Sequence, residues 1–238
     1  MNLIHWDCLI EMQNIPDWSI DMILCDLPYW VSNCSWDIVI PFDKLWEQYN
    51  RIIKPNWAIV LFWNEPFSSN LRISNIKNYR YDWIWEKSKS TWFLNSKKQP
   101  LRWFENICIF YSKQPTYNPQ MKEGKPYNKG IRKQQTQWDI YNNFKQVVVK
   151  SNWERYPKNI IYFKTAESEW RVLHKTQKPI ALLEYLIKTY TNEWDLVLDN
   201  CMGSWSTWVA CRNLNRDFIG IELDEKYFEI AKNRILNN

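Results

Sequence analysis

The clearest indication of the fold of this chain is the segment Val197-Leu198-Asp199-Asn200-Cys201-Met202-Gly203-Ser204-Trp205-Ser206-Thr207. It begins in an apolar run that predicts a buried strand over 195–199, continues as a loop of small and polar residues, and enters a predicted helix over 207–214. A second apolar run over 218–221 ends at Glu222, about 20 residues after the loop. A strand, a small-residue loop and a helix N-terminus, followed by an acidic residue at the next strand end, are typical of a nucleotide-type cofactor site.

The rest of the chain alternates strands and helices in the same way. The apolar runs over 20–25 and 58–62 predict two buried parallel strands. Further strands are predicted over 81–85 and 107–111, and helices over 42–53, 65–76, 179–190 and 224–236. This alternation predicts an α/β fold with a doubly wound, Rossmann-like sheet.

Length and composition set the broad class. With 238 residues, of which 45% are hydrophobic, the chain can form one large domain, or one domain with an insertion. No apolar run approaches the roughly 20 residues that a bilayer span needs, and no secretory leader opens the sequence. Six cysteines without a C-x-x-C pair and only two histidines argue against a metal site and favour reduced thiols. We therefore expect a cytoplasmic protein with no metal and no membrane segment.

The net charge of +5 is unevenly distributed. Residues 112–175 contain 13 Lys and Arg against 5 Asp and Glu, whereas the remainder contains 18 against 21. Helical and strand periodicity weakens over 112–171, where only short strands are predicted, over 146–149 and 160–163. We therefore expect 112–171 to be an insertion in a domain formed by 1–111 and 172–238. A basic insertion is typical of a polyanion-binding surface, although charge alone fits a solvated basic surface equally well.

Tryptophan and glycine occur in abnormal proportions, with 17 Trp against 4 Gly. A chain of this length normally has roughly 17 glycines, because turns and helix C-termini use backbone conformations with φ > 0 that favour glycine. Trp18, Trp57 and Trp194 each follow Asp, Asn or Glu at a predicted turn, where glycine is usual. We hypothesise that many of these positions are UGA codons that the source organism reads as glycine. The alternative is a protein that is genuinely rich in tryptophan.

The tetrapeptide Asp26-Leu27-Pro28-Tyr29 directly follows the predicted strand 20–25. Ligands of open α/β sheets bind at the carboxyl ends of the strands. A carboxylate there, beside a proline-stiffened turn and a tyrosine ring, offers hydrogen-bond acceptors next to a stacking surface, which suits a planar amine such as a nucleobase. Taken alone, such a tetrapeptide is more often a plain turn that ends a strand.

Taken together, these motifs resemble those of site-specific DNA methyltransferases that methylate exocyclic amines, the adenine-N6 and cytosine-N4 family. The order resembles the permuted class, in which an Asp-Pro-Pro-Tyr motif precedes the target-recognition region and the cofactor loop comes last. Leu27 replaces the family's first Pro, at a position that contributes its carbonyl. The motifs are Asp26-Leu27-Pro28-Tyr29, His174-Lys175-Thr176-Gln177-Lys178-Pro179, the loop 199–207 and Ile221-Glu222-Leu223-Asp224.

The same resemblance bears on the tryptophans. The family carries Gly at the positions of Trp30, Trp57, Trp63, Trp92, Trp205 and Trp208, which agrees with the recoding hypothesis. By the same comparison, the tryptophans that look authentic are Trp36, Trp46, Trp83 and Trp85.

The resemblance implies S-adenosyl-L-methionine as cofactor and double-stranded DNA as substrate. The target adenine would be flipped out of the duplex and stacked on Tyr29, and its amine would donate hydrogen bonds to the Asp26 carboxylate and the Leu27 carbonyl. Asp26, Leu27, Pro28 and Tyr29 would thus form a catalytic site that acts by positioning and electrostatics. The implied cofactor site contains Asp7, Cys8, Lys178, Pro179, Asp199, Asn200, Cys201, Met202, Gly203, Ser204, Trp205, Ser206, Thr207, Glu222 on the ribose, and Leu223.

The insertion 112–171 would then recognise the DNA target. Its candidate DNA-binding residues are Lys129, Arg132, Lys133, Lys145 and Arg155. Three questions stay open at this point: whether a cognate restriction endonuclease exists, whether the protein is a monomer or a homodimer, and which DNA sequence it recognises.

Two alternatives differ in chemistry. A cytosine-N4 enzyme, or one that modifies an RNA base or a protein glutamine, uses a similar Pro-Tyr turn, but the opening Asp26, the motif order and the basic insertion favour adenine in DNA. A non-catalytic DNA-binding homologue is favoured if Trp205 and Trp208 are genuine, because indoles in the loop are expected to fill the cofactor's space.

Overall fold

The computed structural model describes residues 2–28, 39–131, 148–168, 177–203 and 205–236, and it divides into two compact units. Unit 1 is formed by Met1–Asn118 and Asn159–Asn238, and unit 2 by Pro119–Lys158. None of the described helices is long and apolar enough to cross a membrane.

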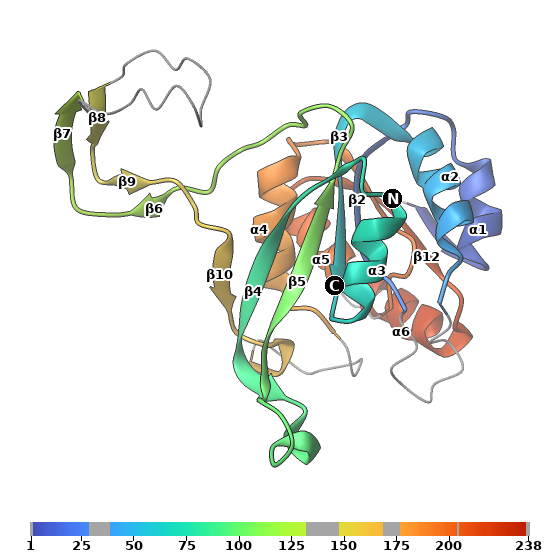
Figure 1. Cartoon of the computed structure of the whole chain (residues 1–238). Helices are drawn as coiled ribbons and strands as arrows, with labels where there is room; N and C mark the ends of the chain where they lie inside the picture. The colour runs from blue at the N-terminus through green and yellow to red at the C-terminus, as the bar shows by residue number, and fades with distance from the viewer. Residues whose placement is uncertain (1, 29–38, 132–147, 169–176, 204, 237–238) are drawn as a thin grey trace. The chain divides into compact units, whose positions relative to one another are not determined.

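Unit 1 is built on one eight-stranded sheet (Figure 1). All neighbouring strands are parallel except at β5, which runs antiparallel to both of its neighbours. In spatial order the strands are β1 (Asn2–His5), β12 (Asp217–Glu222), β11 (Leu196–Asp199), β2 (Ile20–Asp26), β3 (Ile53–Trp63), β5 (Arg102–Phe110), β4 (Tyr79–Thr91) and β10 (Ile160–Phe163). The sequence prediction of a Rossmann-like sheet is confirmed.

Helices cover both faces of this sheet, so its strands are buried on two sides. Side chains alternate along β2: Met22 and Leu24 pack with the helices over 180–190, 206–213 and 225–236, whereas Ile23 and Cys25 pack with the helices over 42–52 and 67–74. The helices are α1 (Cys8–Glu11), α2 (Phe42–Ile52), α3 (Phe67–Ser74), α4 (Ile180–Tyr190), α5 (Ser206–Asn213) and α6 (Glu225–Leu236), with short 3-10 turns at Met12–Asn14, Phe93–Asn95 and Ala166–Ser168.

Three local features differ from the sequence prediction. The segment 54–56, predicted as a turn, lies inside β3, and the register with β2 shifts between Ile20 and Met22 to accommodate it. The predicted strands 81–85 and 107–111 are parts of a longer antiparallel pair, β4 and β5. The strand 160–163, predicted within the insertion, is β10 of the main sheet, where it pairs with β4 and satisfies the backbone groups of that edge.

In its described residues, 119–131 and 148–158, unit 2 has two small antiparallel strand pairs. One pair joins β6 (Lys122–Glu123) to β9 (Glu154–Arg155), and the other joins β7 (Tyr127–Ile131) to β8 (Val148–Ser151). The Arg155 guanidinium lies 4.4 Å from the centre of the Tyr127 ring and donates hydrogen bonds to the Ser151 hydroxyl and the Lys125 carbonyl. Arg155 thereby links strands of both pairs.

Five tryptophans adopt the left-handed backbone conformation. Their φ angles are 51° for Trp18, 70° for Trp92, 65° for Trp153, 69° for Trp194 and 73° for Trp205. Among the other described non-glycine residues, only Asn215 does so, with φ 56°. This conformation costs a residue with a Cβ roughly 1–2 kcal/mol, and Asn tolerates it better than most. These angles support the hypothesis that the natural protein has glycine at the five tryptophan positions.

Backbone conformation does not support glycine at every tryptophan position where the resemblance suggests it. Trp57, Trp63 and Trp208 do not have positive φ angles, so backbone conformation gives no support for glycine there.

The tryptophans expected to be authentic each have a hydrogen-bond acceptor for the indole N–H where the structure describes them. The indole Nε1 donates to the Ser74 hydroxyl in Trp46, to the Tyr190 hydroxyl in Trp83 and to the Phe163 carbonyl in Trp85, over 2.7–3.0 Å. Trp36 lies outside the described residues.

Candidate functional site

The site lies at the carboxyl edge of the parallel strands. Because β1, β12, β11 and β2 run in the same direction, the residues that follow them meet at one edge. His5 pairs with Glu222, and Asp199 pairs with Gly220 in the neighbouring strand. The sheet thus brings together three sequence-predicted segments, those that begin at Asp7, Asp199 and Glu222.

The loop after β11 is held by the buried Asp199 carboxylate. Its Oδ2 accepts a hydrogen bond from the Thr207 hydroxyl at 2.6 Å, and its Oδ1 accepts one from the Cys201 backbone N–H at 3.2 Å. Burial raises the pKa of the Asp199 carboxyl to about 7, although both of these donors lower it. Asp199 therefore ties the beginning of the loop to the first turn of α5.

Glu222 holds the other side of the same loop. Its Oε2 accepts from the Gly203 backbone N–H at 2.8 Å, and its Oε1 accepts from the Asp224 backbone N–H at 2.9 Å. Burial raises the pKa of the Glu222 carboxyl. Gly220 lets the loop lie close to β12, because a Cβ at this position would come within 2.3 Å of the Met202 sulfur. Each Glu222 oxygen has a further lone pair, so the carboxylate can still accept hydrogen bonds from a diol.

The segment after β1 completes this half of the site. The Asp7 carboxylate accepts from the Leu9 N–H at 2.7 Å and caps α1, so Cys8 begins the helix beside the loop. The Asn200 amide donates to the Cys8 sulfur at 3.6 Å, and its carbonyl oxygen accepts from the buried Tyr49 hydroxyl at 2.6 Å. Tyr49 is a residue that the sequence analysis missed, since a tyrosine within an amphipathic helix gives no sequence signal of such a role.

Asp26 ends β2, one strand away from Asp199. The Lys178 ammonium lies 2.5 Å from the Asp26 Oδ2 and 5.3 Å from the centre of the Phe62 ring. Leu27 is buried, and Pro179 lies next to Lys178, where it caps α4. Lys178, expected at the cofactor, thus contacts the carboxylate expected to bind the target.

A family model described as DNA methylase, for N6 and N4 enzymes, matches residues 20–233. The chain belongs to this DNA methylase family. The match spans both the Asp26 segment and the loop after β11, and it confirms the family predicted from the motifs. The protein is a DNA methyltransferase.

Relatives of the methyltransferase align over nearly its whole length. The Type II methyltransferase M.HpaI of Haemophilus parainfluenzae is 28% identical over 251 residues, which cover 98% of this chain and 73% of M.HpaI. The DNA adenine methyltransferase YhdJ of Escherichia coli strain K12 is 27% identical over 252 residues, covering 98% of this chain and 82% of YhdJ.

Solved structures agree on the fold. The crystal structure of the M1.HpyAVI-SAM complex has a TM-score of 0.67 at 26% identity and covers 98% of both chains. The cytosine-N4-specific PvuII DNA methyltransferase has a TM-score of 0.69 at 15% identity, over 99% of this chain and 86% of that one. At that identity the second likeness shows the fold alone.

Several predicted site residues lie outside the described part of the methyltransferase. They are Tyr29, Ser204, Arg132, Lys133 and Lys145, together with the motif residues His174, Lys175 and Thr176. Among the described residues, Leu223 is exposed beside Glu222, and Ser206 is buried at the start of α5.

The loop tryptophans lie elsewhere than the sequence suggested. Both Trp205 and Trp208 are buried in the apolar core with Phe218, and their rings are 5.5 Å apart. The expectation that these indoles fill the cofactor's space is therefore not what the structure shows. The Trp205 Nε1 is buried and has no hydrogen-bond acceptor among the described residues. Trp205 combines a strained backbone with an unsatisfied donor.

Glu105 and Lys87 extend the Asp26 side of the site and were also missed. The Glu105 carboxylate lies 3.0 Å from the Lys87 ammonium and 3.6 Å from that of Lys178. Both residues border apolar strand segments, Glu105 before Ile107–Phe110 and Lys87 after Trp83 and Trp85. A charge adjoining a buried strand is the signal that could have identified them.

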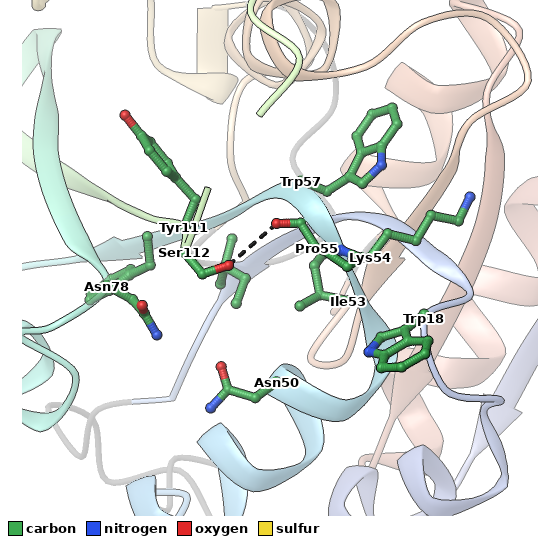
Figure 2. Close-up of a pocket in the computed structure, with 11 residues that line it drawn as sticks. Trp18, Asn50, Ile53, Lys54, Pro55, Trp57, Asn78, Tyr111 and Ser112 are labelled. Carbon is green, nitrogen blue, oxygen red and sulfur yellow. Dashed lines mark hydrogen bonds between the residues drawn. The ribbon is translucent and has the colours of Figure 1, made fainter. Parts of the chain in front are cut away.

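A cavity of about 220 Å³ lies at the opposite edge of the sheet. Figure 2 shows Ile53, Lys54 and Pro55 at the start of β3 on one side of it, and Tyr111 and Ser112 after β5 on the other. Ile53 is nine residues before Phe62, the strand partner of Asp26, or roughly 30 Å at about 3.3 Å per residue. The cavity is separate from the carboxyl-edge site. Among the described residues, no group of three or more His, Cys, Asp or Glu side chains could hold a metal ion.

Proposed function

We propose that this DNA methyltransferase transfers a methyl group from S-adenosyl-L-methionine to the exocyclic N6 of an adenine flipped out of double-stranded DNA. The observation that carries the proposal is the position of Asp26. Its carboxylate ends β2 at the carboxyl edge, paired with Lys178 at 2.5 Å, one strand from the loop that begins at Asp199. An acceptor for the target amine and a loop for the cofactor thus end adjacent strands.

The residues in and around the loop after β11 fit S-adenosyl-L-methionine. Glu222 is a buried acceptor with free lone pairs for two ribose hydroxyls, and Gly203 has a φ of 49°, which lets the loop turn close to a ligand. Asn200 and Cys201 belong to this loop, and the segment with Asp7 and Cys8 lies beside it. The cofactor would supply a methyl group on a sulfonium, which is already a good leaving group. The protein therefore has to bind, orient and exclude water.

Asp26 and Leu27 would orient the target amine, which is the nucleophile of the reaction. The target amine donates one hydrogen bond to the Asp26 carboxylate and one to the Leu27 carbonyl, and these bonds draw the nitrogen lone pair out of conjugation with the ring. The negative charge of Asp26 also stabilises the positive charge that develops on this nitrogen as its bond to the methyl carbon forms and the sulfur–methyl bond breaks. S-adenosylhomocysteine would be the leaving group, and the methylated nitrogen would then lose one proton to solvent. Tyr29 would stack on the flipped base.

Unit 2 would contact the DNA. Lys129 is exposed on β7, where its ammonium lies 5.1 Å from the centre of the Tyr127 ring, and it would contact a phosphate, as would the other exposed lysines of the unit, Lys122, Lys125 and Lys150. Arg155 is engaged with Tyr127 and Ser151 inside unit 2, so we propose a structural role for it in place of a DNA contact. Arg132, Lys133 and Lys145 stay proposed DNA contacts.

The proposal is tested with tritiated S-adenosyl-L-methionine and PCR-amplified bacterial genomic DNA, which contains many short sequences and no methyl groups. We expect incorporation into DNA and, after digestion to nucleosides, N6-methyladenine by mass spectrometry. Asp26→Asn should reduce incorporation by at least about a hundredfold and leave cofactor affinity within about threefold. Asp43→Asn, at an exposed position on α2, is the matched control and should stay active.

Each outcome has a separate meaning. N4-methylcytosine in place of N6-methyladenine would show that the target base is wrong but the family activity is right. Full activity of Asp26→Asn would show that the acceptor for the target amine is another residue.

A further inference from the structure

Four charged side chains form a continuous row at the Asp26 side of the site. From β2 to β4 they are Asp26, Lys178, Glu105 and Lys87, with alternating negative and positive charge and separations of 2.5, 3.6 and 3.0 Å. All four are largely buried, with side-chain exposures of 21, 9, 13 and 5% in the same order. Burying charges is unfavourable unless they are paired, and removing one member leaves its neighbour uncompensated. Such a row adds little net free energy of unfolding, so stability alone does not account for it.

Lys178 lies between two carboxylates. Its ammonium is within hydrogen-bond distance of the Asp26 Oδ2, whereas the Glu105 Oε2 is 3.6 Å away. A shift of about 1 Å along the line between them would exchange one partner for the other, given hydrogen-bond lengths of about 2.8 Å. Lys178 precedes α4, and its four-carbon chain allows such a shift without movement of the helix.

Glu105 is held ready to accept that ammonium. Its Oε1 faces Lys87, which leaves Oε2 directed at Lys178. Burial alone would raise the pKa of the Glu105 carboxyl, but Lys178 and Lys87 outweigh burial and lower it. Lys87 therefore keeps Glu105 ionised and oriented.

We propose that Glu105 is a positioning residue for methyl transfer: it takes over the Lys178 ammonium when the target amine binds Asp26. The inference rests on the proposed role of Asp26. While Lys178 contacts Asp26, it neutralises the carboxylate and places a positive charge beside the nitrogen that becomes positive as the methyl group arrives. Moving Lys178 onto Glu105 restores the negative charge of Asp26 for that step. Lys87 acts indirectly, because its ammonium holds the Glu105 carboxylate in position.

The experiment compares Glu105→Gln and Lys87→Met with variants of an exposed ion pair that also starts from β4. Lys89 and Glu167 form this second pair at 2.6 Å, with exposures of 64 and 60%, and Lys89→Met and Glu167→Gln are the matched controls. For each variant, kcat and KM for PCR-amplified genomic DNA are measured with tritiated S-adenosyl-L-methionine. The affinity for S-adenosylhomocysteine is measured by calorimetry, and unfolding by circular dichroism.

We expect Glu105→Gln to lower kcat by about tenfold to hundredfold, with KM for DNA and cofactor affinity within about threefold. Lys87→Met should lower kcat less, by about three- to tenfold, and the two control variants should match the wild type. Because Glu105 acts through Lys178, Glu105→Gln should have little further effect on kcat in a Lys178→Met background.

The outcomes separate this inference from the proposed function. If the wild type does not methylate DNA, or if Asp26→Asn is fully active, the proposed function fails and the inference fails with it. If wild-type activity depends on Asp26 but Glu105→Gln keeps kcat within twofold, only this inference is overturned. Should Glu105→Gln not fold, Lys87→Met/Glu105→Gln removes the charge pair together and is expected to show the same loss of kcat. Equal losses from Glu105→Gln with and without Lys178 would also overturn the inference.

Discussion

The Lys178 ammonium forms a 2.5 Å ion pair with the Asp26 carboxylate, across 152 positions of the sequence. Asp26 ends β2, and Lys178 comes just before α4, on the face of the sheet where Leu24 and Phe62 also lie. The contact links two motifs that the sequence shows only as separate segments. We therefore propose that Lys178 belongs to the target side of the site, where it would adjust the charge of the proposed catalytic carboxylate.

The stability of the methyltransferase should depend on pH through Asp199. Its pKa is raised from 3.8 to about 7 by burial, so the folded state binds a proton that the unfolded state has released between these values. The contribution of the Asp199 carboxyl to the free energy of unfolding is fully present below pH 3.8 and is lost as the pH rises through about 7. The advantage of the wild type over Asp199→Asn in free energy of unfolding should therefore fall between pH 4 and 7, then level off.

Chemical denaturation at several pH values measures this difference directly. Asp43→Asn, at an exposed position, should show no such trend relative to the wild type. A difference between wild type and Asp199→Asn that rises with pH would contradict the assignment.

Replacing tryptophans of left-handed conformation by glycine should stabilise the chain. Trp18 and Trp194 are exposed, by 64 and 72%, so their indoles contribute little packing while their backbones are strained. Trp18→Gly and Trp194→Gly should each raise the free energy of unfolding by about 1 kcal/mol. Denaturant titration followed by circular dichroism measures the change.

Two controls test the reason for this gain. Asn215→Gly has a comparable φ but should gain only a few tenths of a kcal/mol, because Asn tolerates this conformation. Trp83→Ala should instead lose about 3–5 kcal/mol, since that indole is buried and donates to Tyr190. Destabilisation by both Trp18→Gly and Trp194→Gly would argue that these tryptophans are native. Reading the codons in the gene would decide between UGA and UGG.

Trp205→Gly should tighten cofactor binding by about tenfold to hundredfold. Cofactor binding requires the loop conformation seen in the structure, and we expect the chain with Trp205 to leave that conformation more readily when no cofactor is bound, because Trp205 has a φ of 73° and a buried, unsatisfied indole N–H. Each effect is of order 1–3 kcal/mol, and about 1.4 kcal/mol corresponds to tenfold in affinity. Removing this fully buried indole also leaves a cavity in the core, so Trp205→Gly should not raise the free energy of unfolding as Trp18→Gly does. Calorimetry with S-adenosyl-L-methionine measures the affinity.

The matched variant is Trp194→Gly, which has the same backbone conformation at the other end of β11. It should stabilise the fold without changing cofactor affinity. Equal and tight binding by the chain as printed and by Trp205→Gly would remove Trp205 from the recoding argument.

DNA affinity should depend on salt through unit 2. Each lysine or arginine that neutralises a phosphate contributes about 0.9 to the slope of log affinity against log salt. Neutralising Lys129, Arg132 and Lys133 to Gln should therefore reduce that slope by up to about 2.7 and leave S-adenosyl-L-methionine affinity unchanged. Fluorescence anisotropy with duplex DNA between low and high salt gives the slope.

Lys77→Gln, an exposed lysine of unit 1, serves as the control and should leave the slope unchanged. If the triple variant keeps the wild-type slope, unit 2 does not contact the phosphates through these residues.

The family, the type of sheet and the placement of both motifs after strands could be predicted from the sequence. The largely apolar runs at 20–25, 195–199 and 218–221 are short, and each ends at an acidic residue or directly before one, and they became β2, β11 and β12 with their carboxyl ends at one edge. This was predictable because strand periodicity and strand-end chemistry are local properties of the chain. The shortage of glycine was equally visible in composition alone.

The contacts between the buried charges could not be predicted from the sequence, because they depend on how distant strands pair. In the sequence Glu105 and Lys87 are only charges that adjoin apolar segments, and their relation to Asp26 depends on β5 and β4 lying beyond β3 with a fixed register. The burial of the Trp205 indole in the core and the membership of β10 in the main sheet have the same origin. Pairing between distant strands and the desolvation of charges are set by long-range packing, which no local pattern of residues encodes.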